Sequence, residues 1–196
     1  MRSFMFTTKL VVLVLLVALI GCAGSSRYMK MAPSNASYGP KPGKALIVFM
    51  RPSGFAYAID AGVLHVLPDS NKMVGIVSAK KKVAYSIEPG EHLFMVVGEA
   101  ADFLKAHVEA EKTYYVNVKV RSGVWKARFS LVPIRTDEFE KWSKGTRYVE
   151  NTELSHQWEI DNRSDIESKR NKYYIKWTSK SEAFRQEATL FAEDGH

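Results

Sequence analysis

Histidines on neighbouring predicted strands are the residues whose type and spacing come closest to a metal site. His92 and His107 flank a predicted hairpin centred near Ala100, which would bring them roughly opposite each other. Imidazole nitrogens are common zinc ligands, and His65 could supply a third. Neither a cysteine ligand nor a zinc-motif spacing accompanies them, which favours ordinary surface histidines on the polar faces of strands. We therefore predict no metal or other cofactor, and keep His92 and His107 as the candidates to examine.

No catalytic motif accompanies these histidines. The sequence has no Gly-x-Ser-x-Gly elbow, no His-Glu-x-x-His pair and no phosphate-binding glycine loop. Catalytic triads are defined in space, so an envelope hydrolase or metal-dependent enzyme with a site assembled only by folding stays the alternative. We expect a protein that is not an enzyme.

The chain has one cysteine, Cys22, at the end of an uninterrupted apolar run that begins at Leu10. The run is shorter than the roughly 20 apolar residues that a transmembrane helix needs. A basic start with Arg2 and Lys9, an apolar centre and small residues at the end are typical of a secretory signal peptide. An uncleaved membrane anchor is the alternative, but no basic cluster directly follows the run.

The residues Leu19-Ile20-Gly21-Cys22 resemble the lipobox of bacterial lipoproteins. The resemblance implies cleavage between Gly21 and Cys22, a thioether-linked diacylglycerol on Cys22 and usually an acylated amine. Two or three buried acyl chains are enough to hold a protein at a membrane, whereas one chain binds only marginally. Ala23 in place of aspartate resembles the outer-membrane sorting signal of enteric-type bacteria. We expect a lipid-anchored protein of the outer membrane that faces the periplasm.

Composition and charge argue against nucleic-acid binding. The 28 Lys and Arg residues and 21 Asp and Glu residues give a net charge of +7, and removal of residues 1–21 leaves about +5. That is far from the dense cationic stripe of a nucleic-acid-binding protein. Lys80, Lys81 and Lys82 are expected in a solvated loop, with contact to anionic lipid or glycan as the alternative.

Proline, glycine and serine dominate residues 22–44, which predicts a flexible tether behind the lipidated cysteine.

From Ala45 to residue 134 the apolar period is two, with strands separated by turn residues. Predicted strands are Ala45–Arg51, Phe55–Asp60, Val63–Leu67, Lys72–Val77 and Lys82–Ile87, with a turn at Ala61-Gly62 and further strands to Leu131.

The later strands alternate most clearly between apolar and polar residues. In one of them Tyr114, Val116 and Val118 oppose Asn117 and Lys119. The strand before it is predicted to turn Leu104, Ala106 and Val108 inward, and the one after it Trp125, Ala127, Phe129 and Leu131. One apolar face per strand predicts a mainly β protein, an antiparallel β-sandwich around a single core.

Four segments carry a family resemblance: Ala45–Ser53 (ALIVFMRPS), Tyr57–Gly62 (YAIDAG), Ile87–His92 (IEPGEH) and Lys112–Val118 (KTYYVNV). They resemble an uncharacterised family of bacterial lipoprotein domains, a domain of unknown function similar to the PEGA-type β-sandwich. The match covers about residues 44–121, and its motifs are turn and strand signatures. The resemblance implies a fold but no catalytic residues. Glu111 and Ala61 depart from the family pattern at two turns.

Residues 135–196 change to a period of about 3.6, which predicts a helical C-terminal extension. Helices are expected over Thr136–Trp142 and after a capping box at Ser164–Glu167, with a division near Ser179–Ser181. The second region carries an aromatic stripe opposite lysines: Tyr173, Tyr174, Trp177 and Phe184. Such a stripe usually packs on its own domain, and we expect this; a membrane or partner face is the alternative.

The sequence thus predicts a signal peptide (1–21), a tether (22–44), a β-sandwich (45–134) and a helical extension (135–196). We expect the sandwich to bind or scaffold within the cell envelope. The predicted partners are membrane lipid through Cys22 and an unidentified envelope protein or glycan.

Overall fold

The computed structural model describes residues 26–121 and 128–196. The signal segment, Cys22 and the Trp125–Ala127 part of a predicted strand lie outside the described residues. In the described part, no helix is both long and apolar enough to cross a membrane.

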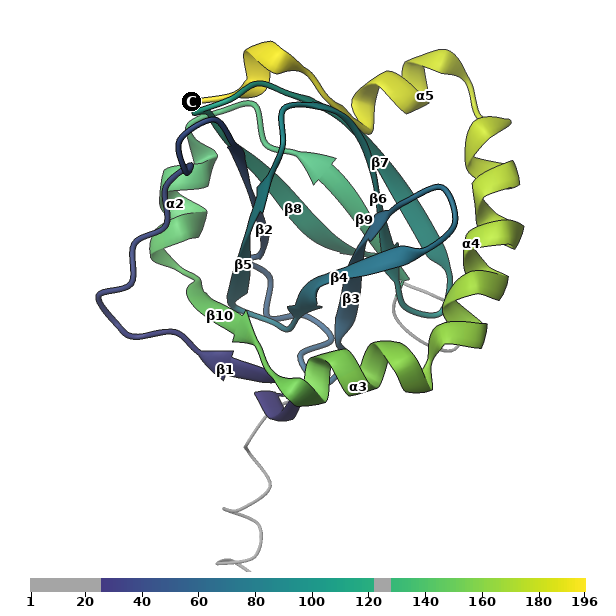
Figure 1. Cartoon of the computed structure of the whole chain (residues 1–196), viewed down its shortest axis with the longest axis horizontal. Coiled ribbons are helices and arrows are strands. Elements are labelled where there is room, and N and C mark those ends of the chain that lie inside the picture. The colour runs from purple at the N-terminus through teal and green to yellow at the C-terminus, as the bar shows by residue number, and fades with distance from the viewer. Residues whose placement is uncertain (1–25, 122–127) are drawn as a thin grey trace, which may run out of the picture.

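Two β-sheets form the body of the protein (Figure 1). The order of the first is β1 (Met29–Met31), β10 (Arg147–Asn151), β5 (Lys81–Ile87), β2 (Ala45–Arg51), β8 (Thr113–Arg121) and β9 (Arg128–Pro133). The order of the second is β11 (Thr189–Leu190), β7 (Ala101–Val108), β6 (Gly90–Val97), β3 (Ala61–Val66) and β4 (Asn71–Val77). This arrangement confirms the predicted mainly β, sandwich-like fold with a C-terminal helical extension.

Both sheets are mixed, which corrects the expectation of antiparallel strands only. β2 pairs with β8, β5 with β10 and β7 with β11 in parallel. Parallel neighbours need a long crossover connection, and here β10 and β11 return to the sheets after helical segments. The apolar pattern of a single strand carries no information about such distant pairing.

The main core lies between the sheets and follows the predicted alternation. Tyr114, Val116 and Val118 of β8 are fully buried, whereas Lys119 is exposed. Every residue of β2 is buried, because β2 has protein on both faces. A strand covered on both sides reads as a continuous apolar run, as Ala45–Arg51 does.

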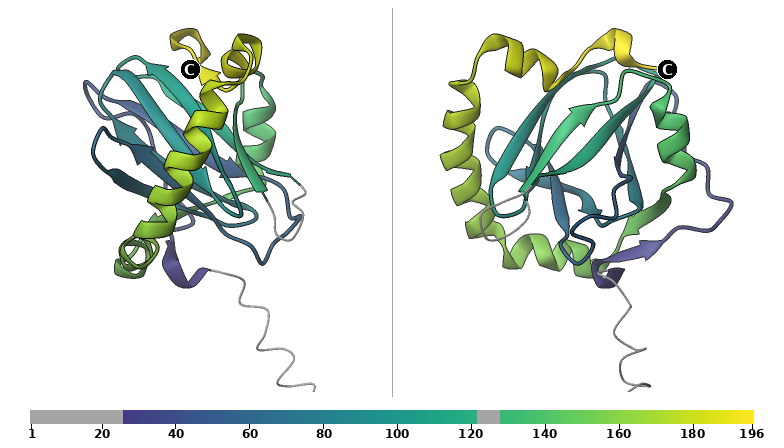
Figure 2. Two further views of the ribbon diagram at one scale, coloured as in Figure 1. Left: turned by 90° about the vertical axis from the view of Figure 1, so that its right-hand side faces the viewer. Right: turned by 180° about the vertical axis from the view of Figure 1, so that it is seen from behind.

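Three helices cover the outer face of the second sheet: α3 (Glu153–Asp161), α4 (Arg163–Thr178) and α5 (Glu182–Glu187). Figure 2 shows α4 crossing in front of the strands, with α3 and α5 at its two ends. Ile166 and Trp177 of α4 pack on Leu64, Met95 and Phe103 of the sheet. The amphipathic stripe therefore faces its own domain.

The helix boundaries correct two expectations. The pattern Ser164–Glu167 does not cap a helix, because α4 begins at Arg163, directly after α3. The capping box lies instead at the start of α3, where Thr152 and Ser155 exchange side-chain and backbone hydrogen bonds. The predicted division of the stripe is correct, since Ser181 caps α5 and accepts a hydrogen bond from the Phe184 N–H.

Helix α2 (Glu138–Lys144) covers the outer face of the first sheet. It begins two residues later than predicted. Phe139 stacks on Tyr115 with ring centroids 4.4 Å apart, and Trp142 packs in the same cluster as Leu46 and Val48. Both faces of the sandwich are thus covered by helices or loops.

The segment predicted as a tether, residues 22–44, includes a strand. Met29–Met31 form β1, which pairs with β10, and Met29 is 3% exposed in the main core. The Ala32 N–H also donates to the Tyr148 carbonyl. A three-residue strand has too little period to detect in a sequence, and its partner lies over a hundred residues away.

The predicted strand Phe55–Asp60 is a loop, and the predicted turn Ala61-Gly62 belongs to β3. The Arg51 guanidinium lies beneath the loop and donates to its carbonyl oxygens. Those carbonyls therefore have partners without a strand neighbour.

Candidate functional site

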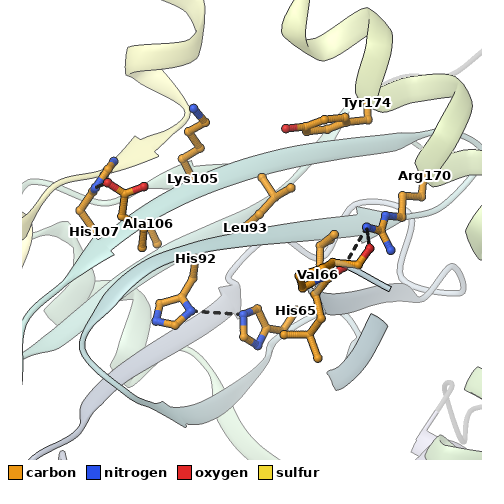
Figure 3. A pocket seen from close by; sticks show the side chains of 12 residues that line it. His65, Val66, His92, Leu93, Lys105, Ala106, His107, Arg170 and Tyr174 are labelled. Carbon is orange, nitrogen blue, oxygen red and sulfur yellow. Dashed lines mark hydrogen bonds and ion pairs between the residues drawn. The ribbon is translucent and has the colours of Figure 1, made fainter. Parts of the chain in front are cut away.

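A pocket of about 500 Å³ lies where α4 crosses the ends of β3, β6 and β7 (Figure 3). The lining residues come from β3 and the turn after it, from the start of β6, from the end of β7 and from α4. They are His65, Val66, Leu67, Pro68, Glu91, His92, Leu93, Lys105, Ala106, His107, Arg170 and Tyr174. Pockets in this size range hold small ligands or a side chain of a partner.

Arg170 fixes the helix against the sheet on one side of the pocket. Its Nη1 and Nη2 atoms donate to the carbonyl oxygens of Leu67 at 2.8 Å, Pro68 at 3.0 Å and Ser70 at 3.1 Å. These carbonyls belong to the turn between β3 and β4. Charge-assisted bonds from one planar guanidinium to three carbonyls hold α4 and the turn in a defined relation.

The outer face of the sheet gives the pocket an apolar floor and a charged rim. Figure 3 shows Leu93 and Tyr174 facing each other across the pocket, with Lys105 beside them. Lys105 is exposed, and no ion pair to it occurs within the described residues. At the far side the His107 ring lies 3.4 Å from a Glu91 carboxylate oxygen and stacks on Phe191.

His65 and His92 line the edge of the pocket, but their side chains lie on the face of the sheet opposite to that of Leu93 and Lys105. They form a hydrogen-bonded pair. The His65 Nε2 and His92 Nδ1 atoms are 3.3 Å apart (Figure 3). His65 Nδ1 lies 3.3 Å from the Tyr85 hydroxyl, and His92 Nε2 lies 2.8 Å from the Glu88 carbonyl oxygen. The carbonyl can only accept, so His92 Nε2 carries a proton. When His65 Nε2 donates to His92 Nδ1, the Tyr85 hydroxyl donates to His65 Nδ1, and His65 is then neutral.

The surroundings of His65 keep it neutral well below its ordinary range. Burial, followed by repulsion from His92 and Lys72, lowers the pKa of His65 to about 4. The ring is 8% exposed and stacks on Phe94. Burial likewise raises the pKa of Tyr85, so this end of the chain of hydrogen bonds also stays neutral. Both ring nitrogens of His65 have hydrogen-bond partners, so neither is free to act as a general base.

The predicted pairing of His92 with His107 is wrong by one residue. His92 pairs with Ala106, and His107 pairs with Glu91. Successive side chains of a strand point to opposite faces, so the two histidines lie on opposite sides of the sheet. Within residues 26–121 and 128–196, no group of three His, Cys, Asp or Glu side chains could hold a metal ion. His65, which the sequence placed third, is the true neighbour of His92.

Part of the aromatic stripe packs against the sheet, and part of it lines the pocket. Trp177 is 2% exposed, and Tyr173 and Phe184 are half-buried against the sheet. Tyr174 is 38% exposed and lines the pocket. The candidate membrane or partner face therefore reduces to Tyr174, with the exposed Ile175 beside it.

Comparison of the chain with protein-family models, with curated proteins and with solved structures gives no match. The resemblance to a lipoprotein family with a PEGA-like domain therefore stays a prediction.

Proposed function

We propose that this chain is a lipid-anchored protein of the bacterial cell envelope, with a sandwich that serves as a non-catalytic binding module. Cys22 carries the lipid after cleavage behind Gly21, and the domain faces the periplasm from the outer membrane. The partner is an envelope protein or a glycan. Nucleic acid is a poor match, because the net charge is modest and both signs are spread along the chain.

The pocket under α4 is the observation that carries the binding role. Its floor is apolar, its rim offers an ammonium group with no ion-pair partner among the described residues, and Arg170 holds its wall in place. An apolar hollow with a few convergent polar groups is the usual form of a binding site. The chemistry fits a ligand with an apolar or sugar-ring body and an anionic group that reaches Lys105.

The hydrogen bonds of the histidine pair support a role without catalysis. Each of the four ring nitrogens of His65 and His92 has a partner, and none of these partners is a carboxylate or a serine or cysteine nucleophile. The alternative is an envelope hydrolase or metal-dependent enzyme. The lowered pKa of His65 beside a pocket is the one observation that favours it. Such an enzyme would have to break the network before either ring could act.

Site-specific photo-crosslinking in cells tests the binding role. We would replace Tyr174 or Ile175 by a photoreactive phenylalanine analogue in the full chain. Both side chains are exposed, at 38% and 71%, but only Tyr174 lines the pocket. We expect a discrete adduct from position 174 and none from position 175.

The Lys105→Glu variant tests the charge at the rim of the pocket. It reverses that charge and removes no buried contact, because Lys105 is exposed. We expect it to weaken the adduct formed from position 174. Equal crosslinking from positions 174 and 175, or a pattern that Lys105→Glu leaves unchanged, would count against a binding role for this pocket.

A further inference from the structure

The loop of residues 52–60, which joins β2 to β3, is held from beneath by a buried arginine. Arg51 is fully buried, and its guanidinium donates to the carbonyl oxygens of Phe55, Ala56 and Ile59. In the described part of the chain no carboxylate hydrogen-bonds to Arg51. Burial of a cation is costly unless its donors find partners. The loop carbonyls satisfy Nη1 and Nη2, whereas Nε has no partner among the described residues, so a change of loop shape would leave further buried donors unpaired.

The loop directs two aromatic side chains into solvent. Phe55 is 63% exposed and Tyr57 is 66% exposed. Between them Ala56 has a φ of 52°, in the left-handed region, and packs against the main core together with Ile59. The inward residues thus fix the loop while the two large rings stay outside. A fixed loop that presents apolar rings is typical of a contact surface.

The loop lies at the end of the sandwich where the described chain begins. Gly62, just after the loop, lies directly against the Trp158 ring of α3. At the start of α3 the Thr152 hydroxyl donates to the Tyr28 carbonyl at 2.7 Å. Tyr28 belongs to the short helix η1 (Ser26–Tyr28), and η1 and α3 lie together along the lower side of Figure 1.

Exposed cations surround the same end. The Lys80 N–H donates to the Arg51 carbonyl, and the Arg147 N–H donates to the Lys80 carbonyl. Both side chains are exposed, and no ion pair to either occurs in the described ranges. Lys82 is different, because it is 5% exposed and donates to the Ser143 carbonyl and hydroxyl. The lysine run therefore gives this surface Lys80 but not Lys82.

The length of chain before η1 identifies what this end faces. Four residue steps separate Cys22 from Ser26. A chain spans at most about 3.6 Å per residue, so Ser26 lies no more than about 14 Å from a lipid-bearing Cys22. A lipidated chain thus keeps this end of the sandwich close to the bilayer surface.

We propose that the loop of residues 52–60 inserts Phe55 and Tyr57 into the headgroup region of the bilayer that holds Cys22. Lys80 and Arg147 contact anionic headgroups beside it. This inference rests on the proposed lipidation of Cys22. Aromatic rings prefer the membrane–water interface, and cations near the surface attract anionic lipid. The contact orients the domain so that the pocket, at the opposite end of β3, lies on the side away from the membrane.

Single-site labelling of the full, membrane-extracted chain tests the contact. Lipidation consumes the only native thiol, so Ala58→Cys introduces one reactive thiol beside both aromatic residues and leaves them intact. Ile175→Cys is the matched control on α4. Each variant is labelled with a polarity-sensitive fluorophore and reconstituted into vesicles of phosphatidylethanolamine and phosphatidylglycerol that contain a spin-labelled lipid. A ring buried 5–10 Å into the interface should place the label at position 58 within quenching range, with quenching about twofold or more above that at position 175.

The Phe55→Ser/Tyr57→Ser double variant, made in the Ala58→Cys background, should bring quenching down to the control level while the thermal melt is unchanged. Equal quenching at positions 58 and 175, with the parent protein unreactive to the thiol reagent, would overturn the membrane contact alone. A parent protein that reacts at Cys22 would overturn the proposed anchor and, with it, this inference.

Discussion

The His65 Nε2 atom lies 3.3 Å from the His92 Nδ1 atom, within a row of hydrogen bonds that begins at the Tyr85 hydroxyl and ends at the Glu88 carbonyl. Burial and these hydrogen bonds keep His65 neutral. Protonation of His65 Nδ1 would take the acceptor from the Tyr85 hydroxyl and place a charge on a ring that is only 8% exposed. His65 therefore opposes protonation.

The stability of the domain should decrease as the pH falls from about 6.5 toward 4. The pKa of His65 is lowered to about 4 in the folded chain, against about 6.5 in an unfolded one, so the unfolded state binds the proton first. Urea unfolding at pH 7 and pH 4.5 measures the change, and we expect His65 to account for about 1–3 kcal/mol of it.

Two variants separate His65 from the other groups that titrate in this range. His65→Gln should lose that part of the pH dependence, whereas His156→Gln, at an exposed position of α3, should keep it. The same pH slope in His65→Gln and the parent would refute the assignment of a neutral His65.

Trp177→Ala should destabilise the domain strongly. Trp177 is 2% exposed and packs on Phe103, with ring centroids 6.1 Å apart, so its removal leaves a cavity between α4 and the sheet. Large aromatic truncations in a core cost about 3–5 kcal/mol. Ile175→Ala, two residues earlier and 71% exposed, should change the free energy of unfolding little.

Trp177→Phe refines this test. The indole Nε1 has no hydrogen-bond partner in the described part of the chain, so phenylalanine loses packing volume but no hydrogen bond. We expect a cost well below that of alanine. A melt of Trp177→Ala that matches the parent would show that the helices contribute nothing to the fold.

Substitutions on β8 test the face assignment. Val118 is fully buried and Lys119 is exposed, and a slip of one residue would exchange them. Val118→Asp places a carboxylate in the main core without a partner and should unfold the domain. Lys119→Asp should change the thermal midpoint by only a few degrees. Equal melts would contradict the register.

Local patterns predicted the parts of the fold that depend on one segment. The alternation of Thr113–Arg121 identified its buried face, and the aromatic stripe around Trp177 identified the face of α4 that meets the sheet.

Pairing between distant segments could not be predicted in the same way. Met29–Met31 pairs with a strand more than a hundred residues later, and nothing in either segment specifies the other. The prediction that His92 and His107 lie opposite each other was wrong for the same reason. The register of β6 against β7 decides that His92 and His107 face apart, and the pairing of β3 with β6 brings His65 to His92. The burial of Arg51 beneath the loop could not be predicted either, because its partners are backbone carbonyls, which every residue type carries.

We propose that Cys22 carries the lipid that holds this domain at the membrane. Metabolic labelling with a fatty-acid probe, on cells that express either the parent or Cys22→Ala, tests it most directly. We predict label on the parent at the size of the cleaved chain, and an unlabelled, uncleaved precursor for Cys22→Ala. Label on Cys22→Ala, or a parent chain that takes up none, would refute the lipidation of Cys22.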